Sequence, residues 1–227
     1  MIGRPRVHVR ETGSTNEHAR VLAAAGAPHG TLVTAGVQTA GRGRQGRRWE
    51  APAGTALLLS IVIRELDPLL SLRAGLAVAD LAGTEAQVKW PNDVLVSGRK
   101  VAGVLVEGRP QAGWAVLGVG VNVAVDPAAL PLELRETAGT LGRPRGELEA
   151  ALGELLVALE RRLSEPAGDV LAALRDRDAL LGAPVRWIGG EGTGVGIDAT
   201  GGLLVSVGSG ETVVLDAGEV HLGQLRQ

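Results

Sequence analysis

GRGRQGRRW, at residues 41–49, brings four arginines, three glycines and a tryptophan together in a chain whose formal net charge is only -2. Glycine lets a backbone approach a ligand closely, and arginine offers planar donors that match carboxylate or phosphate oxygens. Tryptophan supplies a flat face for a ring. The stretch therefore predicts an anion-binding loop beside a stacking platform.

Outward from this loop, the sequence predicts a mixed sheet covered by helices. Alternating or Val- and Leu-rich runs with glycine punctuation indicate strands, and amphipathic runs with capping signals indicate helices. We expect strands at residues 7–10, 31–38, 55–63, 86–90, 94–96, 101–107 and 114–125. We expect helices at residues 14–25, where Ser14 opens a capping box, at 71–81, capped by Ser71, and at 147–163 and 169–181. The predicted fold class is α+β.

From residue 182 onward the sequence pattern changes to short apolar runs separated by glycine pairs and acidic residues. Short strands at regular spacing with turn signals suggest a small barrel or sandwich. We expect these strands at residues 184–188, 193–198, 203–207, 212–215 and 219–222. The sequence thus predicts a domain boundary near residue 181, with one domain at 1–181 and a smaller one at 182–227.

Composition limits the class of protein. With 227 residues, 45% of them hydrophobic, the chain can bury a substantial core. Cysteine is absent, which excludes disulfides and is compatible with a reducing cytosol. The N-terminus lacks the apolar region of a signal peptide, and the apolar run at 57–63 is far too short to cross a bilayer. We therefore expect a cytoplasmic protein with no membrane partner.

The positive charges are distributed unevenly by type. Arginine occurs 21 times and lysine only twice, as Lys89 and Lys100, on either side of the segment Trp90-Pro91-Asn92-Asp93. An ammonium group is a compact point charge that can follow charge developing at a reacting atom, unlike the fixed fork of a guanidinium. The two lysines therefore indicate a second functional segment.

Rival interpretations of the arginine loop fit less well. The glycines at 41, 43 and 46 satisfy G-x-G-x-x-G, but residues 47–54 lead through Pro52 and Gly54 into a strand instead of opening a helix. A Walker A motif is absent from the sequence. Arginine-glycine loops with an aromatic residue also bind RNA, but a sequence pI of about 6.1 offers no basic surface to support one. RNA binding remains the alternative outside enzymes.

Four motifs, in their order along the chain, resemble the successive motifs of biotin protein ligases. They are QTAGRGRQGRRW at 38–49, KWPND at 89–93, GRKVAGVLVE at 98–107 and GVGVN at 118–122. The segment at 14–16 resembles that family's early biotin-contacting segment. The resemblance covers essentially the whole chain and implies a class II synthetase-like catalytic domain followed by an SH3-like β-barrel.

The resemblance implies a two-step activity. Biotin and Mg-ATP would give biotinyl-5'-AMP and pyrophosphate, and the acyl group would pass to a lysine of the biotin carboxyl carrier domain of a carboxylase. The residue types suit this chemistry, because the repulsion between two anions must be offset by fixed positive charge. The candidates for that charge are Arg42, Arg44 and Lys100.

By the same resemblance, individual residues receive expected roles. The biotin-binding residues would be Ser14, Thr15, Asn16, Gln38, Gly41, Arg42, Gly43, Arg44, Lys100, Gly103, Gly118 and Gly120. The ATP or adenylate residues would be Arg42, Arg44, Arg47, Trp49, Lys89, Asn92, Lys100 and Asn122. Within these sets, the last three biotin glycines would leave space for apolar parts of biotin, Trp49 would stack near the adenine, and Asn122 would contact its edge.

The catalytic candidates are Lys100, Arg44 and Asp93. Asp93 would orient or deprotonate the acceptor amine, or it is a structural residue that follows a Pro-containing turn. Lys89 would reach pyrophosphate oxygens or pair with an acid. The sequence suggests no protein-held metal, so Mg²⁺ would arrive with ATP.

The resemblance also sets expectations for partners. Larger members of the family carry an N-terminal helix-turn-helix module, and this sequence enters the catalytic region almost at Met1, so DNA regulation is not expected. A lipoate ligase of similar fold is the closest alternative among enzymes. The sequence leaves open which carboxylase is the acceptor and whether a homodimer forms.

Overall fold

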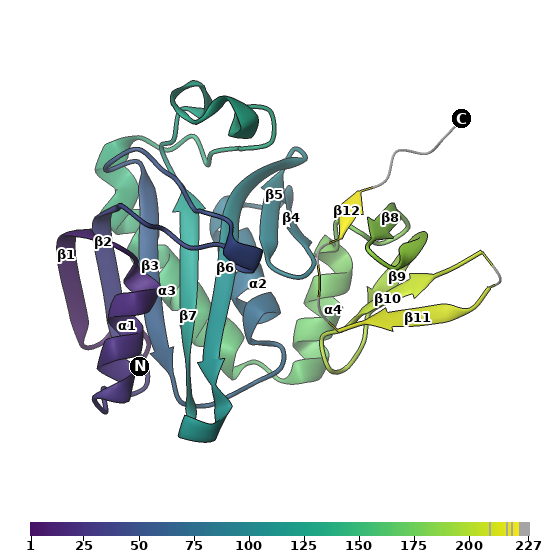
Figure 1. Cartoon of the computed structure of the whole chain (residues 1–227), viewed down its shortest axis with the longest axis horizontal. Helices are drawn as coiled ribbons and strands as arrows, with labels where there is room; N and C mark the ends of the chain where they lie inside the picture. The colour runs from purple at the N-terminus through teal and green to yellow at the C-terminus, as the bar shows by residue number, and fades with distance from the viewer. Residues whose placement is uncertain (209, 217, 219, 223–227) are drawn as a thin grey trace.

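A seven-stranded mixed sheet forms the body of the protein in the computed structural model, which describes residues 1–208, 210–216, 218 and 220–222 (Figure 1). Its strand order is β1-β2-β3-β7-β6-β5-β4. The strands are β1 Arg6–Thr12, β2 Leu32–Gln38, β3 Ala56–Ile63, β4 Ala86–Lys89, β5 Asp93–Val96, β6 Arg99–Arg109 and β7 Trp114–Asn122. β1 and β2 are parallel, and the other neighbours in the sheet are antiparallel.

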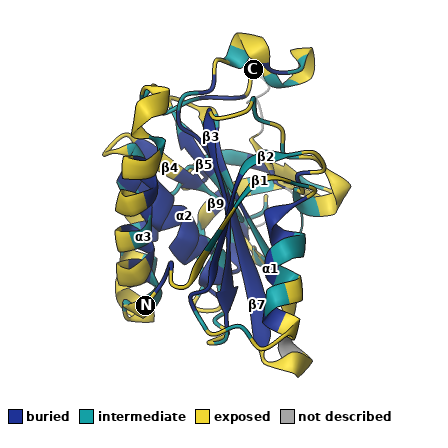
Figure 2. Cartoon of the chain, turned by 90° about the vertical axis from the view of Figure 1, so that its left-hand side faces the viewer, coloured by how far each residue is buried: buried dark blue, intermediate teal, exposed yellow. Residues whose placement is uncertain are grey.

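Helices cover the two faces of this sheet, as Figure 2 shows. α1 Thr15–Ala24 packs on one face against β2, β3 and β7, where alanine and valine side chains and Trp114 form a small buried cluster. α2 Leu70–Ala82 and α3 Leu148–Ser164 lie on the other face over the larger core. Because both faces are covered, all eight residues of the central strand β3 are buried. The expected α+β fold class is confirmed.

Two helix starts differ from the sequence prediction. Ser14 is at the N-cap position of α1, but its side chain makes no capping hydrogen bond. α2 begins at Leu70 after Leu69 as N-cap, and the hydroxyl of Ser71 donates instead to the carbonyl of Pro91 at 3.0 Å. The Ser71 hydroxyl, which the local sequence assigns to a helix cap, is therefore used in a hydrogen bond to a distant part of the chain.

The fourth helix also ends earlier than expected. α4 Ala167–Arg177 was predicted to continue to residue 181. Instead, Asp178 forms a parallel bridge with Val88, and the amide of Ala179 donates to the carbonyl of Val88 at 3.0 Å. Pairing with the edge strand β4 therefore ends the helix. Shorter 3₁₀ turns are η1 Arg44–Gly46, η2 Pro110–Ala112, η3 Pro127–Ala129, η4 Leu132–Leu134 and η5 Arg145–Glu147.

The C-terminal strands form a second, antiparallel sheet with the order β11-β10-β9-β8-β12. Its strands are β8 Pro184–Trp187, β9 Gly190–Ile197, β10 Leu203–Ser206, β11 Thr212–Leu215 and β12 His221–Leu222. In the described part of the chain this sheet is open, with β11 and β12 at its edges, whereas a closed barrel was expected. Glu219, the start of the last expected strand, and residues 223–227 lie outside the described residues.

The second sheet shares its apolar core with the first. Leu180, Val185, Leu203 and Val205 belong to the same buried cluster as the α2 and α3 side of the large sheet. The indole N–H of Trp90 donates to the carbonyl of Gly201 at 2.9 Å. Among the described residues, no helix has the length and apolarity needed to cross a membrane.

Arg73 is a buried charge that ties α2 to the end of α3. Its side chain is only 6% exposed, and Nε lies 2.5 Å from the Asp67 carboxylate. Nη1 donates to the carbonyls of Arg162 at 2.8 Å and Glu165 at 2.6 Å. The guanidinium thus satisfies backbone acceptors at a helix C-terminus that water reaches poorly.

We predict that Arg73→Leu lowers the free energy of unfolding by about 3 kcal/mol, because it leaves a carboxylate and two carbonyls without their partner. Arg161→Leu is the matched control. Arg161 also pairs with a carboxylate, Asp80, but its side chain is 60% exposed, so its loss should cost at most about 1 kcal/mol. Urea unfolding of both variants checks this, and equal losses would contradict the burial argument.

Candidate functional site

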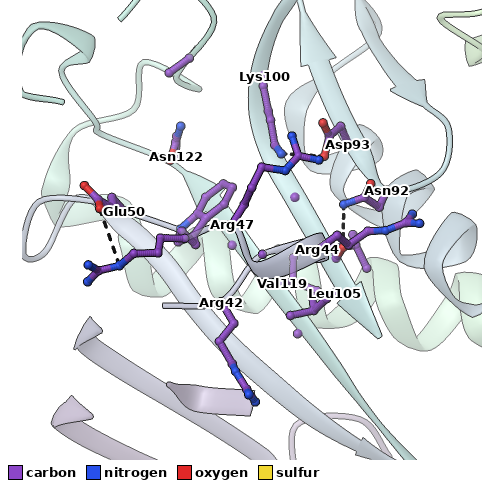
Figure 3. Close-up of a pocket in the computed structure, with 18 of the residues that line it drawn as sticks. Arg42, Arg44, Arg47, Glu50, Asn92, Asp93, Lys100, Leu105, Val119 and Asn122 are labelled. Carbon is purple, nitrogen blue, oxygen red and sulfur yellow. Dashed lines mark hydrogen bonds and ion pairs between the residues drawn. The ribbon is translucent and has the colours of Figure 1, made fainter. Parts of the chain in front are cut away.

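A cavity of about 450 Å³ opens between the arginine loop, strands β6 and β7, and the segment at 130–138. It collects side chains from segments far apart in the sequence (Figure 3). Of the residues predicted for the site, these line the cavity: Ser14, Thr15, Asn16, Gln38, Arg42, Gly43, Arg44, Arg47, Trp49, Lys89, Asn92, Asp93, Lys100, Gly103, Gly118, Gly120 and Asn122. Gly41 is buried beside it, where a Cβ atom would clash with the carbonyl oxygen of Trp49.

The floor of the cavity is formed by glycines on two neighbouring strands. A Cβ atom at Gly120 would lie 2.5 Å from Cε2 of Trp49. One at Gly103 would lie 3.1 Å from Cζ3 of Trp49 and 3.4 Å from Nζ of Lys100. These two glycines were expected to leave room for apolar parts of biotin. In the structure their free space is filled by the Trp49 ring and the Lys100 amine.

Gly118 plays the same part at the other end of the cavity. A Cβ atom there would clash with the side-chain amide of Asn16, which occupies the space. This position was also expected to accommodate biotin. The missing side chain instead lets Asn16, in the first turn of α1, lie directly against β7.

A buried polar network surrounds this end. The amide and hydroxyl of Thr15 donate to Oε1 of Gln38 at 2.7 and 3.0 Å. The hydroxyl of Ser60, which is fully buried on β3, donates to Oδ1 of Asn16 at 2.6 Å and lies 2.7 Å from Oγ1 of Thr15. Such a network holds its members in fixed directions because an unpaired buried polar group is costly.

Arg42 leaves the loop toward α1, not toward the cavity centre. Its Nη1 atom lies 3.4 Å from Oε2 of Glu17 and 3.2 Å from Oε1 of Glu107. Figure 3 shows its side chain pointing away from Lys100. The prediction that Arg42 contributes charge beside Lys100 is therefore not supported by its position here.

Lys100 and Asp93 form the charged centre of the cavity. Nζ of Lys100 lies 2.7 Å from Oδ1 of Asp93 and 5.7 Å from the centroid of the Trp49 ring. Figure 3 shows Arg47 extending toward the same place. The carboxylate and the aromatic face hold the ammonium in a fixed direction, from which it can attract an anion that enters the cavity.

A β-bulge aims Lys100 into the cavity. Asp93 pairs with Gly103 and Val94 with Ala102, but the register between β5 and β6 then shifts, so that Leu95 pairs with Lys100. Strict alternation would place positions 100 and 103 on opposite faces of the sheet. The extra residue brings the Lys100 amine over Gly103, which is how bulges redirect side chains at functional sites.

Two polar atoms at the Trp49 end are left without a hydrogen-bond partner in the described part of the chain. Nδ2 of Asn122 donates to the carbonyl of Gly139 at 2.9 Å, which fixes the amide orientation. Oδ1 of Asn122 and the indole N–H of Trp49 are buried without a hydrogen-bond partner among the described residues. The cavity therefore offers an acceptor and a donor beside an aromatic ring.

Asn92 and Arg44 line the cavity on the side toward the C-terminal segment. Nδ2 of Asn92 donates to the carbonyl of Val104 at 3.0 Å, and the guanidinium of Arg44 donates to the carbonyl of Gly218 at 3.1 Å. Arg44 thus connects the loop to the C-terminal segment, where His221 and Leu222 also line the cavity. No group of three or more metal-ligating side chains occurs in the described ranges.

Sequence reasoning missed three residues that the structure adds to the site: Ser60, Glu17 and Glu107. Ser60 is the single hydroxyl residue in the apolar run of β3, and that contrast was a usable signal. Glu107 ends the motif at 98–107 and was quoted without a role. Glu17 lies in the first turn of the helix predicted at 14–25, and its partnership with Arg42 had no signal in the sequence.

The comparisons with known proteins agree with this geometry. The chain matches the Biotin/lipoate A/B protein ligase family over residues 10–123. It is 41% identical to the biotin–acetyl-CoA-carboxylase ligase of Mycobacterium tuberculosis, over 94% of this chain and 88% of that protein. It is 34% identical to the bifunctional ligase/repressor BirA of Bacillus subtilis over 71% of this chain, and the match spans 54% of that relative.

Solved structures agree as well. The fold superposes on the biotin protein ligase from Aquifex aeolicus in complex with biotin and ATP with a TM-score of 0.81 and 26% identity, covering 97% of this chain and all of that one. The fold, together with a ligand cavity that is lined by glycines, a lysine and an arginine-rich loop, places the protein in the class of ligases. The chain belongs to the biotin/lipoate A/B protein ligase family.

We predict that Gly120→Ala lowers the free energy of unfolding by about 1–3 kcal/mol, because the added methyl group overlaps the partly buried Trp49 ring. Gly153→Ala on α3 is the matched control. A Cβ atom there meets nothing within 4 Å, so this change should stabilise the helix by about 0.5–1 kcal/mol. Chemical denaturation measures both. An unchanged free energy of unfolding for Gly120→Ala would show that the position of the Trp49 ring does not depend on a glycine at residue 120.

Proposed function

We propose that this protein is a biotin protein ligase. It would activate biotin with ATP to biotinyl-5'-AMP and then transfer the biotinyl group to a lysine of the biotin carboxyl carrier domain of a carboxylase. The observation that carries the proposal is the Lys100 amine, held 2.7 Å from Asp93 over the glycine floor. It lies between a buried polar end of the cavity and an aromatic end.

In the first step, a carboxylate oxygen of biotin attacks the α-phosphorus of ATP, and pyrophosphate leaves with the bonding electrons. Both reactants are anions, and charge grows on the phosphorus oxygens as the new bond forms. Lys100 would offset this charge, with Arg44 and Arg47 contributing from the loop. Lys89 would act on the pyrophosphate side. Mg²⁺ would accompany ATP and be held mainly by its phosphate oxygens.

The polar end of the cavity suits the ureido ring of biotin. Thr15, Gln38 and Ser60 present buried donors and acceptors whose directions are set by one another. Ser14 is buried at the same turn with its hydroxyl not used for capping. Preorganised groups of this kind bind a polar ring without a cost of reordering.

The aromatic end suits adenine. Oδ1 of Asn122 is an acceptor for the exocyclic amine, and its direction is fixed by the bond from Nδ2 to Gly139. The Trp49 ring lies next to it on Gly120. A buried acceptor that pairs only when ligand is bound gives strong discrimination against bases that lack a donor there.

In the second step, the acceptor lysine attacks the acyl carbon, an amide forms, and AMP leaves. Asp93 would orient or deprotonate that amine after its partner Lys100 turns toward the phosphate. The glycine-flanked loop with Arg42 would close over the adenylate and keep water from the mixed anhydride.

We further propose that residues 1–181 hold both substrates and that residues 182–227 form an SH3-like domain. The C-terminal segment reaches the site through the bond between Arg44 and Gly218 and through His221 and Leu222 in the cavity lining. This placement supports a role for the domain near the mouth of the site, where a carrier domain would present its lysine.

We expect the protein to catalyse ATP–pyrophosphate exchange that depends on biotin, followed by transfer of labelled biotin to a carrier domain. Because the family includes lipoate ligases, the same assay is run with lipoate. Exchange with lipoate alone would reassign the substrate. Tight, length-dependent oligonucleotide binding at physiological salt, without any exchange, would favour the RNA alternative.

Lys100→Ala should lower biotin-dependent exchange by about 10²–10³-fold, because the ammonium stabilises charge that develops in the transition state. Arg109→Ala is the control, since Arg109 is an exposed cation at the far end of the same strand. Initial exchange rates at saturating ATP test this. Near-normal turnover by Lys100→Ala would rule out the role assigned to the amine.

A further inference from the structure

The carboxylate of Glu107 joins two parts of the site that the sequence places far apart. Its Oε2 atom accepts a hydrogen bond from Nδ2 of Asn16 at 2.8 Å, and its Oε1 atom accepts one from Nη1 of Arg42 at 3.2 Å. Asn16 is in the first turn of α1, and Arg42 belongs to the arginine loop. The two carboxylate oxygens of Glu107 therefore bind two different elements, α1 and the arginine loop.

The Asn16 contact is fixed in space. Oδ1 of Asn16 accepts from the buried hydroxyl of Ser60, and the amide lies over Gly118, where no side chain intervenes. Asn16 is itself buried, at 4% exposure. Because this amide has little freedom, it directs the Glu107 carboxylate, and the second carboxylate oxygen is presented to the loop.

The Arg42 contact is the part that loop opening would break. Glu17 also faces Arg42 at 3.4 Å, but Glu17 is engaged by Arg20 at 2.5 Å. The Arg20 guanidinium holds the pKa of Glu17 below its usual value, chiefly through their hydrogen bond. Glu107 is the nearer of the two carboxylates and the one that is also anchored to the buried network.

We infer that Glu107 is a positioning residue that couples the biotin-proximal turn to closure of the arginine loop. This inference rests on the proposed function. The chain of contacts runs from Gln38 and Thr15 through Ser60 and Asn16 to Glu107 and then to Arg42. Groups at the end proposed to bind the ureido ring and the loop that retains the adenylate are thereby held in one arrangement.

The size of the effect follows from the exposure of the pair. The side chains of Arg42 and Glu107 are 47% and 34% exposed. An ion pair of this kind shifts an opening equilibrium by about two- to fivefold and is weakened by salt. Loss of the pair should therefore increase escape of the adenylate by a similar factor and remove much of the salt dependence of that escape.

The test uses the full-length protein and measures three quantities: biotin-dependent exchange, the KM for biotin, and escape of biotinyl-AMP seen as labelling of a bystander protein. Glu107→Gln keeps a carbonyl acceptor for Asn16 but removes the charge that binds Arg42. Escape relative to exchange should rise about two- to fivefold, and added salt should increase it much less than in the unmodified protein, since only the Glu17 contact to Arg42 remains. The KM for biotin should change by less than twofold.

Glu107→Ala removes both contacts, so it should raise escape and the KM for biotin together. Glu149→Gln is the matched control, because it deletes a carboxylate that pairs with Arg6, away from the cavity. If Glu107→Gln leaves the escape ratio and its salt dependence as in the unmodified protein, the coupling is refuted. An equal rise in escape for Glu149→Gln would also refute it.

Arg42→Gln tests the same pair from the other side if a Glu107 variant does not fold. It should raise escape and abolish its salt dependence, and persistent salt dependence would overturn the proposal. Combining Arg42→Gln with Glu107→Gln should give no more escape than Arg42→Gln alone. The proposed function fails separately, if the unmodified protein shows no biotin-dependent exchange at all.

Discussion

The site depends on the absence of side chains at two positions of the central sheet. Gly103 on β6 and Gly120 on β7 leave a shallow space that the Trp49 ring and the Lys100 amine fill. A methyl group at Gly120 would overlap atoms of Trp49, and one at Gly103 would lie 3.1 Å from the ring, which is itself packed against the apolar cluster around Leu130 and Ala138. The ligand cavity is the volume that remains above this layer.

Around this layer the charges are arranged in two separate groups. Lys100 and Asp93 form one group at the cavity centre, and Arg42, Glu17 and Glu107 form the other at its edge. The separation matters because an arginine bound to two carboxylates anchors a loop, whereas a lysine near an aromatic face is available to an incoming anion. The loop is thus anchored at the edge of the cavity by Arg42, while the charge at the centre comes from Lys100 on β6.

Much of the fold could be predicted from the sequence. Hydrophobic alternation and glycine punctuation located the strands of the large sheet to within a few residues, and β11 at Thr212–Leu215 was predicted without error. Helix ends were less predictable, because Ser71 bonds to Pro91 and residue 178 pairs with β4. Those partners come from distant parts of the chain. Barrel closure at the C-terminus was expected and is not observed among the described residues.

The sequence by itself determined which segments form the site: the glycine-arginine loop, the two lysines of the chain, and the motifs that end in Glu107 and Asn122. It could do so because residue type fixes charge, size and backbone freedom. The tertiary structure alone decided how they meet. A bulge in β6 reverses the face expected for Lys100, and the packing of α1 against β7 brings Asn16 to Glu107. Both depend on strand register and helix placement, which are set by the packing of the whole core and not by neighbours in the chain.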